Sequence, residues 1–433
     1  MKKAIITLLI IWGMMSGLHA GTTGKLAGIV TDKNNGEPLV GVNIVIKGTT
    51  MGAASGMDGQ YFIVNIPVGV YVVDATMIGY KKQSIANVVI AADLTTKIDF
   101  KLIEEPIAAG EEVVVVAERP LIQKDLTASI DITDAGQVRT LPVTNYKQVV
   151  DLQTGIVVVP IRLDMAGPYG QFDSTPDDGI HSRGGRTNET AYLLNGIAVK
   201  DPLWGAFFID DLPILGLNQL VTYKGTYLAE YGEGMSAVMN MVSEPNLKQP
   251  TFNYTTFTDR LDFVNLEKMN TYNHELVYQG TIPQTKDKLT SNLAVKYNTT
   301  DGRFWGYIYP NYRDSEGYDK SGTPKKVPMN YDDYWSTMGS LRFFPSKNLS
   351  LLVGGVATDR RTSFYNHYFK YNPYGNPRVR RNYWLGYLQS KHVLSNKYFY
   401  ELSLSRYDLN FKSNIFDDLK TSLIEKHVES PER

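Results

Sequence analysis

The regular alternation of apolar and polar residues after residue 250 constrains the fold of this chain more than any other feature. The alternation is clearest in the runs Leu289–Asn298 and Tyr400–Ser405. A period of two places successive side chains on opposite faces of a β-strand, and runs of about ten such residues are typical of transmembrane barrel strands. We therefore expect seven strands, at residues 251–263, 272–282, 288–299, 332–344, 349–362, 382–394 and 398–412.

The connectors between these strands alternate in length. Those at 283–287, 345–348 and 395–397 are short and polar, whereas those at 300–331 and 363–381 are long and aromatic. Outer-membrane barrels place short turns on the periplasmic side and long loops outside. The alternative, a β-sandwich without a membrane, predicts neither this parity nor the concentration of the 28 tyrosines after residue 250.

The long loops carry aromatic side chains that are candidates for ligand binding. Aromatic rings stack on sugars, siderophores and peptides. They also pack at membrane interfaces, so both interpretations stay open. The candidates are Trp305, Tyr307, Tyr309, Tyr365 and Tyr368.

The N-terminal end has the features of an export signal. Lys2 and Lys3 precede an apolar run from Ala4 to Gly17, which ends shortly before Ala20. This run is too short to span a hydrocarbon layer of about 30 Å comfortably. We therefore expect residues 1–20 to be a secretory signal peptide.

Composition excludes several classes of function. The 44 basic and 45 acidic residues leave a net charge of −1, which argues against a nucleic-acid partner. The chain has no Cys, and its six His lack the spacing of metal ligands, so we expect neither enzyme activity nor a cofactor. Asp173, Asp177 and Asp178 form either a solvated acidic loop or a calcium site.

Residues 23–103 consist of short strand-like runs separated by turn signals such as Asp58-Gly59. The segments Gly24–Asp32, Glu37–Val42 and Ser55–Tyr61 resemble the carboxypeptidase-regulatory-like domain. This resemblance implies a seven-stranded β-sandwich without catalytic residues. The expected strands are Leu26–Thr31, Val42–Lys47, Gln60–Ile66, Val70–Met77, Ile85–Ala91 and Thr95–Leu102.

Residues 129–248 form a glycine-rich segment. The stretches Gly179–Arg186, Tyr192–Pro202 and Leu220–Val242 resemble, as an ordered set, the mixed α+β plug domain of TonB-dependent outer-membrane receptors. Its motif falls on Arg183, Gly184, Gly185, Asn195, Gly196, Asp201, Pro202, Gly232 and Gly234.

Two expectations concern the first part of that motif. We expect Arg183 and Arg186 either to pair with acidic side chains of the barrel wall or to be solvated. We expect Gly184 and Gly185 to be required by the backbone rather than by a ligand, because adjacent glycines suggest backbone angles that a β-carbon disfavours.

Residues 104–128 have the composition of a linker that contains one strong strand. Four valines in succession form an adhesive edge, which a partner protein captures by β-augmentation or which pairs inside the next domain. The resemblance makes this strand a candidate TonB box. Its residues are Glu112, Val113, Val114, Val115, Val116 and Ala117.

The resemblances together imply a mainly β protein whose last segment, 251–433, is part of a transmembrane antiparallel barrel. They imply an outer-membrane receptor with periplasmic N-terminal domains that takes up an unidentified nutrient. Because the sequence has no P-loop, the energy would come through TonB from its proton-driven inner-membrane motor. A surface adhesin and a receptor that signals without transport remain as alternatives.

A strand count adds one expectation. The family resemblance implies 22 strands, which at about ten residues each need roughly 220 residues. Only 433 − 250 = 183 residues follow Pro250. We therefore expect the intact gene product to be longer than this chain.

Overall fold

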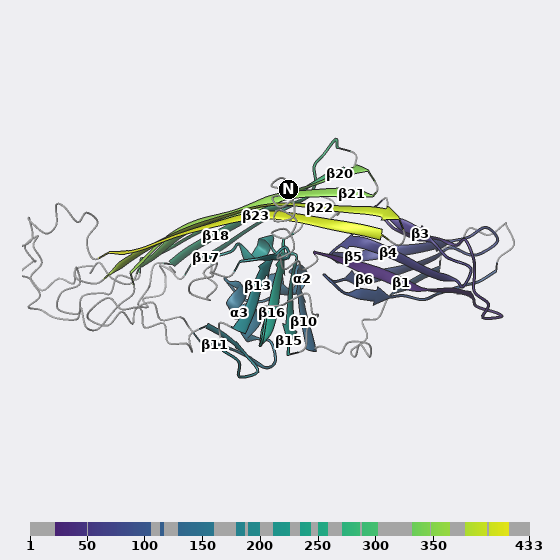
Figure 1. The fold of residues 1–433 in the computed structure, drawn as a ribbon, viewed down its shortest axis with the longest axis horizontal. Helices are drawn as coiled ribbons and strands as arrows, with labels where there is room; N and C mark the ends of the chain where they lie inside the picture. Colours follow the sequence, from purple (N-terminus) through teal and green to yellow (C-terminus); the bar gives the residue numbers. More distant parts are fainter. Residues whose placement is uncertain are drawn as a thin grey trace, which may run out of the picture.

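The fold comes from a computed structural model that describes residues 22–49, 51–104, 113–116, 129–159, 179–186, 189–199, 211–225, 234–243, 250–258, 271–285, 288–301, 331–346, 348–363, 377–395 and 398–414. Figure 1 shows a small sandwich at one end, a plug in the middle, and a long curved sheet, the wall, that passes over the plug. In these ranges no helix is long and apolar enough to cross a membrane. The expected signal peptide lies outside the described residues.

The sandwich contains two facing sheets with an apolar interior. One sheet has the order β4-β1-β7 with β8 also on β1, and the other has the order β3-β2-β5-β6-β9. Side chains such as Leu26, Ile44 and Phe100 are completely buried between them. The strands are β1 (Thr23–Asp32), β2 (Asn43–Ile46), β3 (Gly52–Ala54), β4 (Gln60–Pro67), β5 (Gly69–Thr76), β6 (Gln83–Ile90), β7 (Thr95–Lys97), β8 (Phe100–Leu102) and β9 (Val113–Val116).

The predicted sandwich is confirmed, but it has nine strands in the described residues rather than seven: β3 was not predicted, β9 joins the second sheet, and one expected strand is divided. The expected strand Thr95–Leu102 is interrupted at Ile98, and both halves run parallel to β1. The carbonyl oxygen of Ile98 accepts a hydrogen bond from the Tyr61 hydroxyl at 2.8 Å. The strand is thus interrupted where its backbone binds the Tyr61 side chain. The alternation of apolar and polar residues could not locate this position.

The four-valine strand β9 pairs with the sandwich. Val113–Val116 lies parallel to Gln83–Ala86 of β6, at one end of the sheet order. The sequence suggested capture by a partner or pairing inside the next domain, and the structure instead pairs β9 with the preceding one. The reason is that β6 would otherwise be an open edge, which four consecutive strand formers can cover.

The plug is built on a five-stranded sheet with the order β10-β15-β16-β13-β14, in which β13 and β16 run parallel. Every residue of β13, β15 and β16 is buried. Asp134 and Asn145 cap two short helices through their side chains. The elements are β10 (Ser129–Asp134), α2 (Ala135–Thr140), α3 (Tyr146–Asp151), β11 (Ile156–Val159), β12 (Gly179–Ser182), β13 (Thr190–Leu194), β14 (Ile197–Ala198), η2 (Ile214–Gly216), β15 (Gln219–Lys224) and β16 (Ala237–Val242).

The wall contains the seven strands that alternation predicted, joined antiparallel in chain order. Leu293, Val295 and Tyr297 are 37 to 49% exposed on one face, whereas Lys296 is fully buried on the other. The predicted apolar-out, polar-in arrangement is therefore confirmed. The strands are β17 (Thr251–Thr258), β18 (Thr271–Thr281), β19 (Leu289–Asp301), β20 (Tyr331–Ser346), β21 (Leu349–Ser363), β22 (Arg378–Ser395) and β23 (Tyr398–Asn414).

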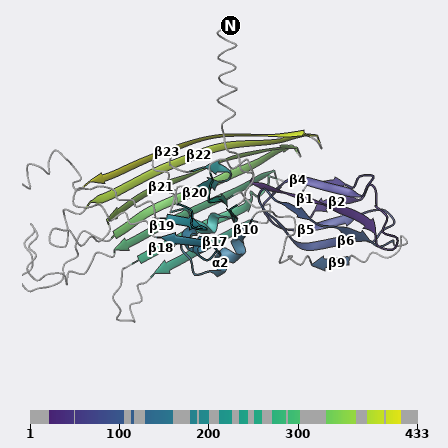
Figure 2. The same cartoon turned by 60° about the horizontal axis from the view of Figure 1, so that its bottom comes forward.

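The sandwich contacts both other bodies (Figure 2). The backbone N–H of Ala92 donates to the Gln219 side chain at 3.0 Å, and the Tyr223 hydroxyl donates to the Ala92 carbonyl at 3.4 Å. Lys391 of the wall donates to the Thr23 hydroxyl at 3.1 Å. The end of the sandwich is thus attached to the plug sheet and to the short-turn end of the wall.

Candidate functional site

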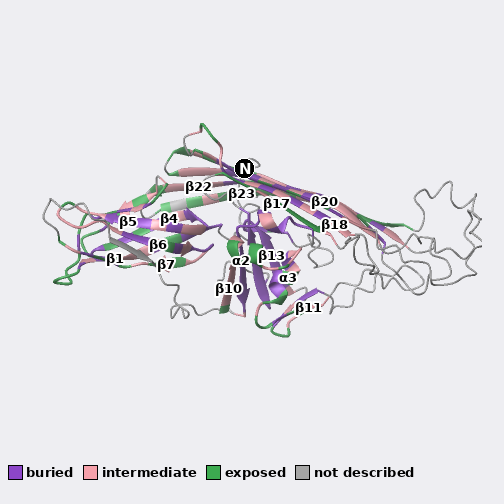
Figure 3. Ribbon diagram, turned by 180° about the vertical axis from the view of Figure 1, so that it is seen from behind, coloured by how far each residue is buried: buried purple, intermediate pink, exposed green. Residues whose placement is uncertain are grey.

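The wall turns toward the plug a face on which many polar side chains lie beside apolar ones such as Val277 and Ala294. Figure 3 shows buried residues along the wall and throughout the plug sheet. Because burying a polar group costs free energy unless it is hydrogen-bonded, this face requires partners on the plug. Its buried polar residues include Asn273, Glu275, Gln279, Asn292, Lys296, Asn298, Arg342, Arg381, Gln389 and Lys391.

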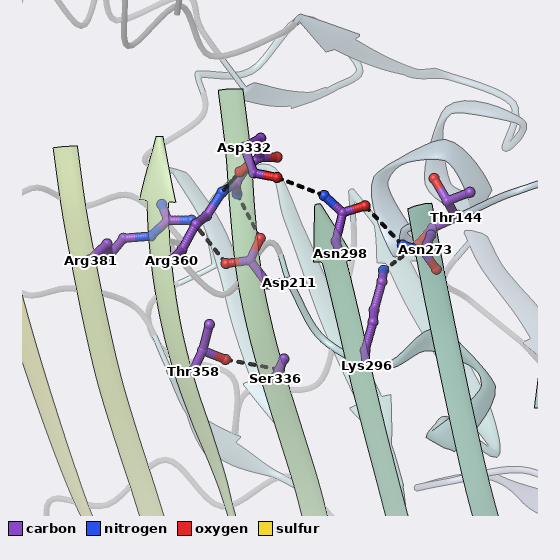
Figure 4. A network of polar contacts seen from close by, with 10 residues as sticks. All are labelled: Thr144, Asp211, Asn273, Lys296, Asn298, Asp332, Ser336, Thr358, Arg360 and Arg381. Carbon is purple, nitrogen blue, oxygen red and sulfur yellow. Dashed lines mark hydrogen bonds and ion pairs between the residues drawn. The ribbon is translucent and has the colours of Figure 1, made fainter. Parts of the chain in front are cut away.

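An ionic cluster joins plug and wall at the long-loop end (Figure 4). Asp211 of the plug accepts from Arg360 of β21 at 2.6 Å and from Arg381 of β22 at 3.3 Å. Arg360 also forms a two-bond contact with Asp332 of β20, at 2.7 and 2.8 Å. Because Arg360 and Arg381 lie directly opposite each other, the buried Asp211 carboxylate separates two like charges.

A second polar contact lies one strand further along the wall. The Lys296 ammonium donates to the carbonyl of Thr144 at 2.5 Å, just before helix α3 (Figure 4). Glu275, opposite Lys296 on β18, accepts from the backbone N–H of Leu215 at 2.6 Å. The wall therefore holds plug backbone through charged side chains, which are stronger partners than neutral ones.

Asn195 connects its own turn to the wall. It has a positive φ of 50° before Gly196 at 77°, which is the two-residue turn that Asn-Gly predicts between β13 and β14. Its side-chain amide donates to the Tyr387 hydroxyl at 2.6 Å, and its carbonyl accepts from Gln389 at 2.8 Å. The motif residues Asn195 and Gly196 thus lie at the interface.

Plug and wall approach closely at Gly216. A β-carbon there would lie 2.5 Å from the Cβ of Ala294 and 2.7 Å from the Cε of Met338. The Gly216 carbonyl also accepts from the side chains of Asn292 at 2.7 Å and Gln279 at 3.2 Å. Only glycine leaves room for this contact between backbone and wall.

The Arg183–Gly185 segment lies on the plug itself. Arg183 and Arg186 are exposed, and the ion pairs described between plug and wall use Asp211 instead. Gly184 has φ +79° with open space around it, as expected. Gly185 needs glycine for a different reason, since a β-carbon would lie 2.2 Å from the Ser236 hydroxyl oxygen.

Other predicted site residues lie outside the described part of the chain. They are Glu112, Ala117, Asp201, Pro202, Gly232, Trp305, Tyr307, Tyr309, Tyr365, Tyr368 and the acidic residues Asp173, Asp177 and Asp178. Within the described ranges, no three His, Asp or Glu residues form a group that could hold a metal ion.

Sequence reasoning missed the ionic cluster. One signal was present, because the doublets Arg360-Arg361 and Arg380-Arg381 end and begin neighbouring strands. In a strand, one member of each doublet must face inward. No sequence pattern indicated that Asp211 would meet the inward pair.

These observations define a protein in which a small mixed domain is packed against the polar face of an antiparallel wall. Residues 122–238 match the model of the TonB-dependent Receptor Plug Domain, and residues 26–115 match that of the CarboxypepD_reg-like domain. The chain therefore carries the plug domain of TonB-dependent receptors, preceded by a CarboxypepD_reg-like domain. The second match includes Val113, Val114 and Val115 of β9.

Two curated relatives are named as TonB-dependent receptors. The TonB-dependent receptor SusC of Bacteroides thetaiotaomicron is 26% identical over 204 residues, which are 45% of this chain and 18% of SusC. The TonB-dependent receptor P3 of Formosa agariphila is 24% identical over 170 residues, 39% of this chain and 16% of P3. The chain thus spans less than a fifth of each relative's length.

The similar solved structures include two receptors. The alcaligin outer-membrane receptor FauA of Bordetella pertussis gives a TM-score of 0.47 at 12% identity, covering 67% of this chain and 40% of that one. The ferric enterobactin receptor of Pseudomonas aeruginosa gives 0.46 at 12% identity, covering 66% and 42%.

Proposed function

We propose that this chain acts in a TonB-dependent outer-membrane receptor that takes up a nutrient ligand with energy transmitted from the inner membrane. The observation that carries the proposal is the division of the wall into two faces. Its apolar outer face suits lipid, and its inner face, which carries many polar side chains beside an apolar cluster, is covered by the plug. The hydrogen bonds and ion pairs between plug and wall can be exchanged for water when the plug moves.

The orientation follows from the connectors. The short turns lie at the end of the wall that contacts the sandwich through Lys391 and Thr23. Because short turns are periplasmic in such proteins, the proposal puts the sandwich and β9 in the periplasm, where TonB can reach them. The long loops then lie outside, where a ligand arrives.

In this proposal β9 is the TonB box. One edge of β9 pairs with β6, and its other edge borders no other strand in the described part of the chain. A strand of TonB can therefore pair with that edge through backbone hydrogen bonds. This pairing depends on backbone donors rather than on particular side chains.

Substitution of Val114 tests the assignment. Val114→Pro removes a backbone donor and fixes φ, so it should abolish binding of the purified periplasmic domain of TonB, measured by surface plasmon resonance. It should also abolish uptake in cells without lowering ligand affinity at the surface. Val114→Thr keeps the donor and the strand preference and should bind normally. Equal TonB binding by the proline variant and the unmodified chain would contradict the assignment.

Signalling without transport is a second candidate, and one observation favours it. The hydrogen bonds between Ala92 and the plug residues Gln219 and Tyr223 connect the plug directly to the sandwich. A displacement of the plug would therefore reach an N-terminal domain exposed to periplasmic partners. Uptake of the co-purifying ligand with and without a protonophore separates the two, because a receptor that only signals takes up no ligand under either condition.

A further inference from the structure

The outer face of the wall carries a row of cations at its long-loop end. Arg361 of β21 lies directly opposite Arg380 of β22, and Arg380 lies directly opposite Lys412 of β23. The side chains of Arg361 and Arg380 are 62 and 50% exposed, and Lys412 is also exposed. Neighbouring strands are about 4.8 Å apart, so the three cations form one continuous basic surface.

Such a row is unfavourable in the isolated sheet. Like charges directly opposite each other destabilise a strand pair. Asp359 compensates part of the charge, with oxygens 3.0 and 3.1 Å from Arg380 and 4.0 Å from Arg361. Asp333 is the second carboxylate beside the row: it lies opposite Arg361 and accepts a hydrogen bond from Thr299. Among the described residues, these three cations and two carboxylates leave one net positive charge.

The row lies beside a belt of aromatic side chains on the same face. Tyr297, Trp335 and Trp384 are 46 to 49% exposed there. Trp335 lies opposite Asp359, which is two residues, or about 7 Å, from Arg361. Aromatic belts occur at the boundary between hydrocarbon and headgroups, so the cations lie just beyond it, at the depth of lipid phosphates.

We infer that Arg361, Arg380 and Lys412 form a binding surface for the phosphate groups of membrane lipids in the leaflet on the long-loop side. Charge complementarity carries this inference, because phosphate supplies the negative charge that the cation row lacks. Guanidinium groups suit this role, since their planar donors match phosphate oxygens in pairs. The inference rests on the proposed membrane location of the wall.

Energy transfer from tryptophan to labelled lipid tests the surface, because Trp335 and Trp384 lie beside it. The full chain in dodecyl maltoside micelles is titrated with dansyl-labelled phosphatidic acid or with equally labelled phosphatidylcholine. We expect clear preference for phosphatidic acid. Each cation near an anionic surface contributes about fivefold in affinity, so Arg361→Gln/Arg380→Gln/Lys412→Gln should weaken that preference on the order of a hundredfold.

Two further variants keep the test decisive. Lys412→Gln alone, at an exposed position on the last described strand, should reduce the preference about fivefold even if the triple variant fails to fold. Arg406→Gln removes another exposed cation, which pairs with Asp408 at 2.9 Å, and it should leave the preference unchanged. An unchanged preference in both the triple and the Lys412 variant would overturn the inference.

The phosphatidylcholine titration separates this inference from the proposed function. Transfer from both lipids without preference would leave the membrane location standing and overturn the phosphate surface. Absence of transfer from either lipid would overturn the membrane location and the inference with it. Inorganic phosphate at matched ionic strength should not displace the labelled lipid, since a headgroup surface binds many phosphates held together in a membrane; displacement would overturn the assignment to lipid.

Discussion

The interior of the sandwich and the interface between plug and wall are both closed to solvent and both contain an apolar cluster, but the interface adds many buried polar and charged side chains to it. Leu26, Ile44 and Phe100 bury hydrocarbon in the sandwich. Asn195, Asp211 and Lys296 bury hydrogen-bonding groups and charges between plug and wall. Apolar burial is nonspecific and costly to open, whereas each polar contact has a modest net value because water can replace it.

The difference suggests how two closed regions of one chain serve different purposes. The sandwich interior is suited to staying closed. The plug–wall interface joins an apolar cluster to hydrogen bonds and ion pairs. The polar contacts hold one arrangement, and they can be released because water entering the interface satisfies the same donors and acceptors. Buried charges there also make the position of the plug specific, because a shift would leave Arg360 or Arg381 without Asp211.

The largest expected effect comes from the apolar interior. Phe100→Ala should lower the free energy of opening the sandwich by about 3–5 kcal/mol, because it leaves a cavity beside Tyr61. Amide hydrogen exchange of β1 and β4 measures this. Phe62→Ala, at a 50% exposed position of the same sheet, is the control and should cost far less. Comparable losses in both variants would break the comparison.

Removal of the plug carboxylate should weaken the interface but not the sandwich. Asp211→Ala leaves Arg360 and Arg381 facing each other. It should lower the free energy that holds the plug against the wall by about 3 kcal/mol. Faster exchange of the Leu212–Leu217 amides, with β1 unchanged, is the expected signature. Asp408→Asn removes an exposed carboxylate and should change neither region.

The two adjacent glycines should respond to different substitutions. Gly184→Asn should be tolerated, because Asn adopts positive φ more readily than other residues and the site is open. Gly185→Asn should lower the stability of the plug by about 1–3 kcal/mol, because the new side chain would overlap with Ser236. Permeability of cells to large antibiotics reports plug seating. Leakage caused by the Gly184 variant and not by the Gly185 variant would reverse the assignment.

The smallest effect concerns acid sensitivity of the sandwich. The backbone N–H of Asn34, at 2.6 Å, and the Tyr80 hydroxyl, at 2.9 Å, lower the pKa of the Asp32 carboxyl. The hydrogen bond to Asp32 in turn raises the pKa of Tyr80. The ionised Asp32 carboxyl therefore stabilises the folded sandwich above about pH 4, and this stabilisation is lost as pH falls through the lowered pKa of Asp32.

On the alkaline side, the protonated Tyr80 hydroxyl stabilises the folded sandwich below about pH 10. This stabilisation is lost as pH rises through the raised pKa of Tyr80. Asp32→Asn should flatten the acid limb of the sandwich's stability profile, measured by hydrogen exchange between pH 3 and 7. An unchanged acid limb would show that Asp32 does not participate.

The sequence by itself determined the strands and their faces. Alternation from Leu289 to Asn298 specifies which side chains face outward, and Asn195-Gly196 specifies a tight turn, because both depend on residues adjacent in the chain. The CarboxypepD_reg-like and plug domains were likewise recognisable from ordered motifs. The domain boundaries and the assigned role of β9 stay predictions.

Only the tertiary structure decided which groups meet. Asp211 finds Arg360 and Arg381 at separations of 149 and 170 residues, and β9 pairs with β6 rather than with the domain that follows it. Local periodicity carries no information about such pairs, since many carboxylates could balance the same two arginines. Shape complementarity selects one of them: Gly216 lets the plug backbone approach the wall, and that approach brings Asp211 within reach of both guanidinium groups.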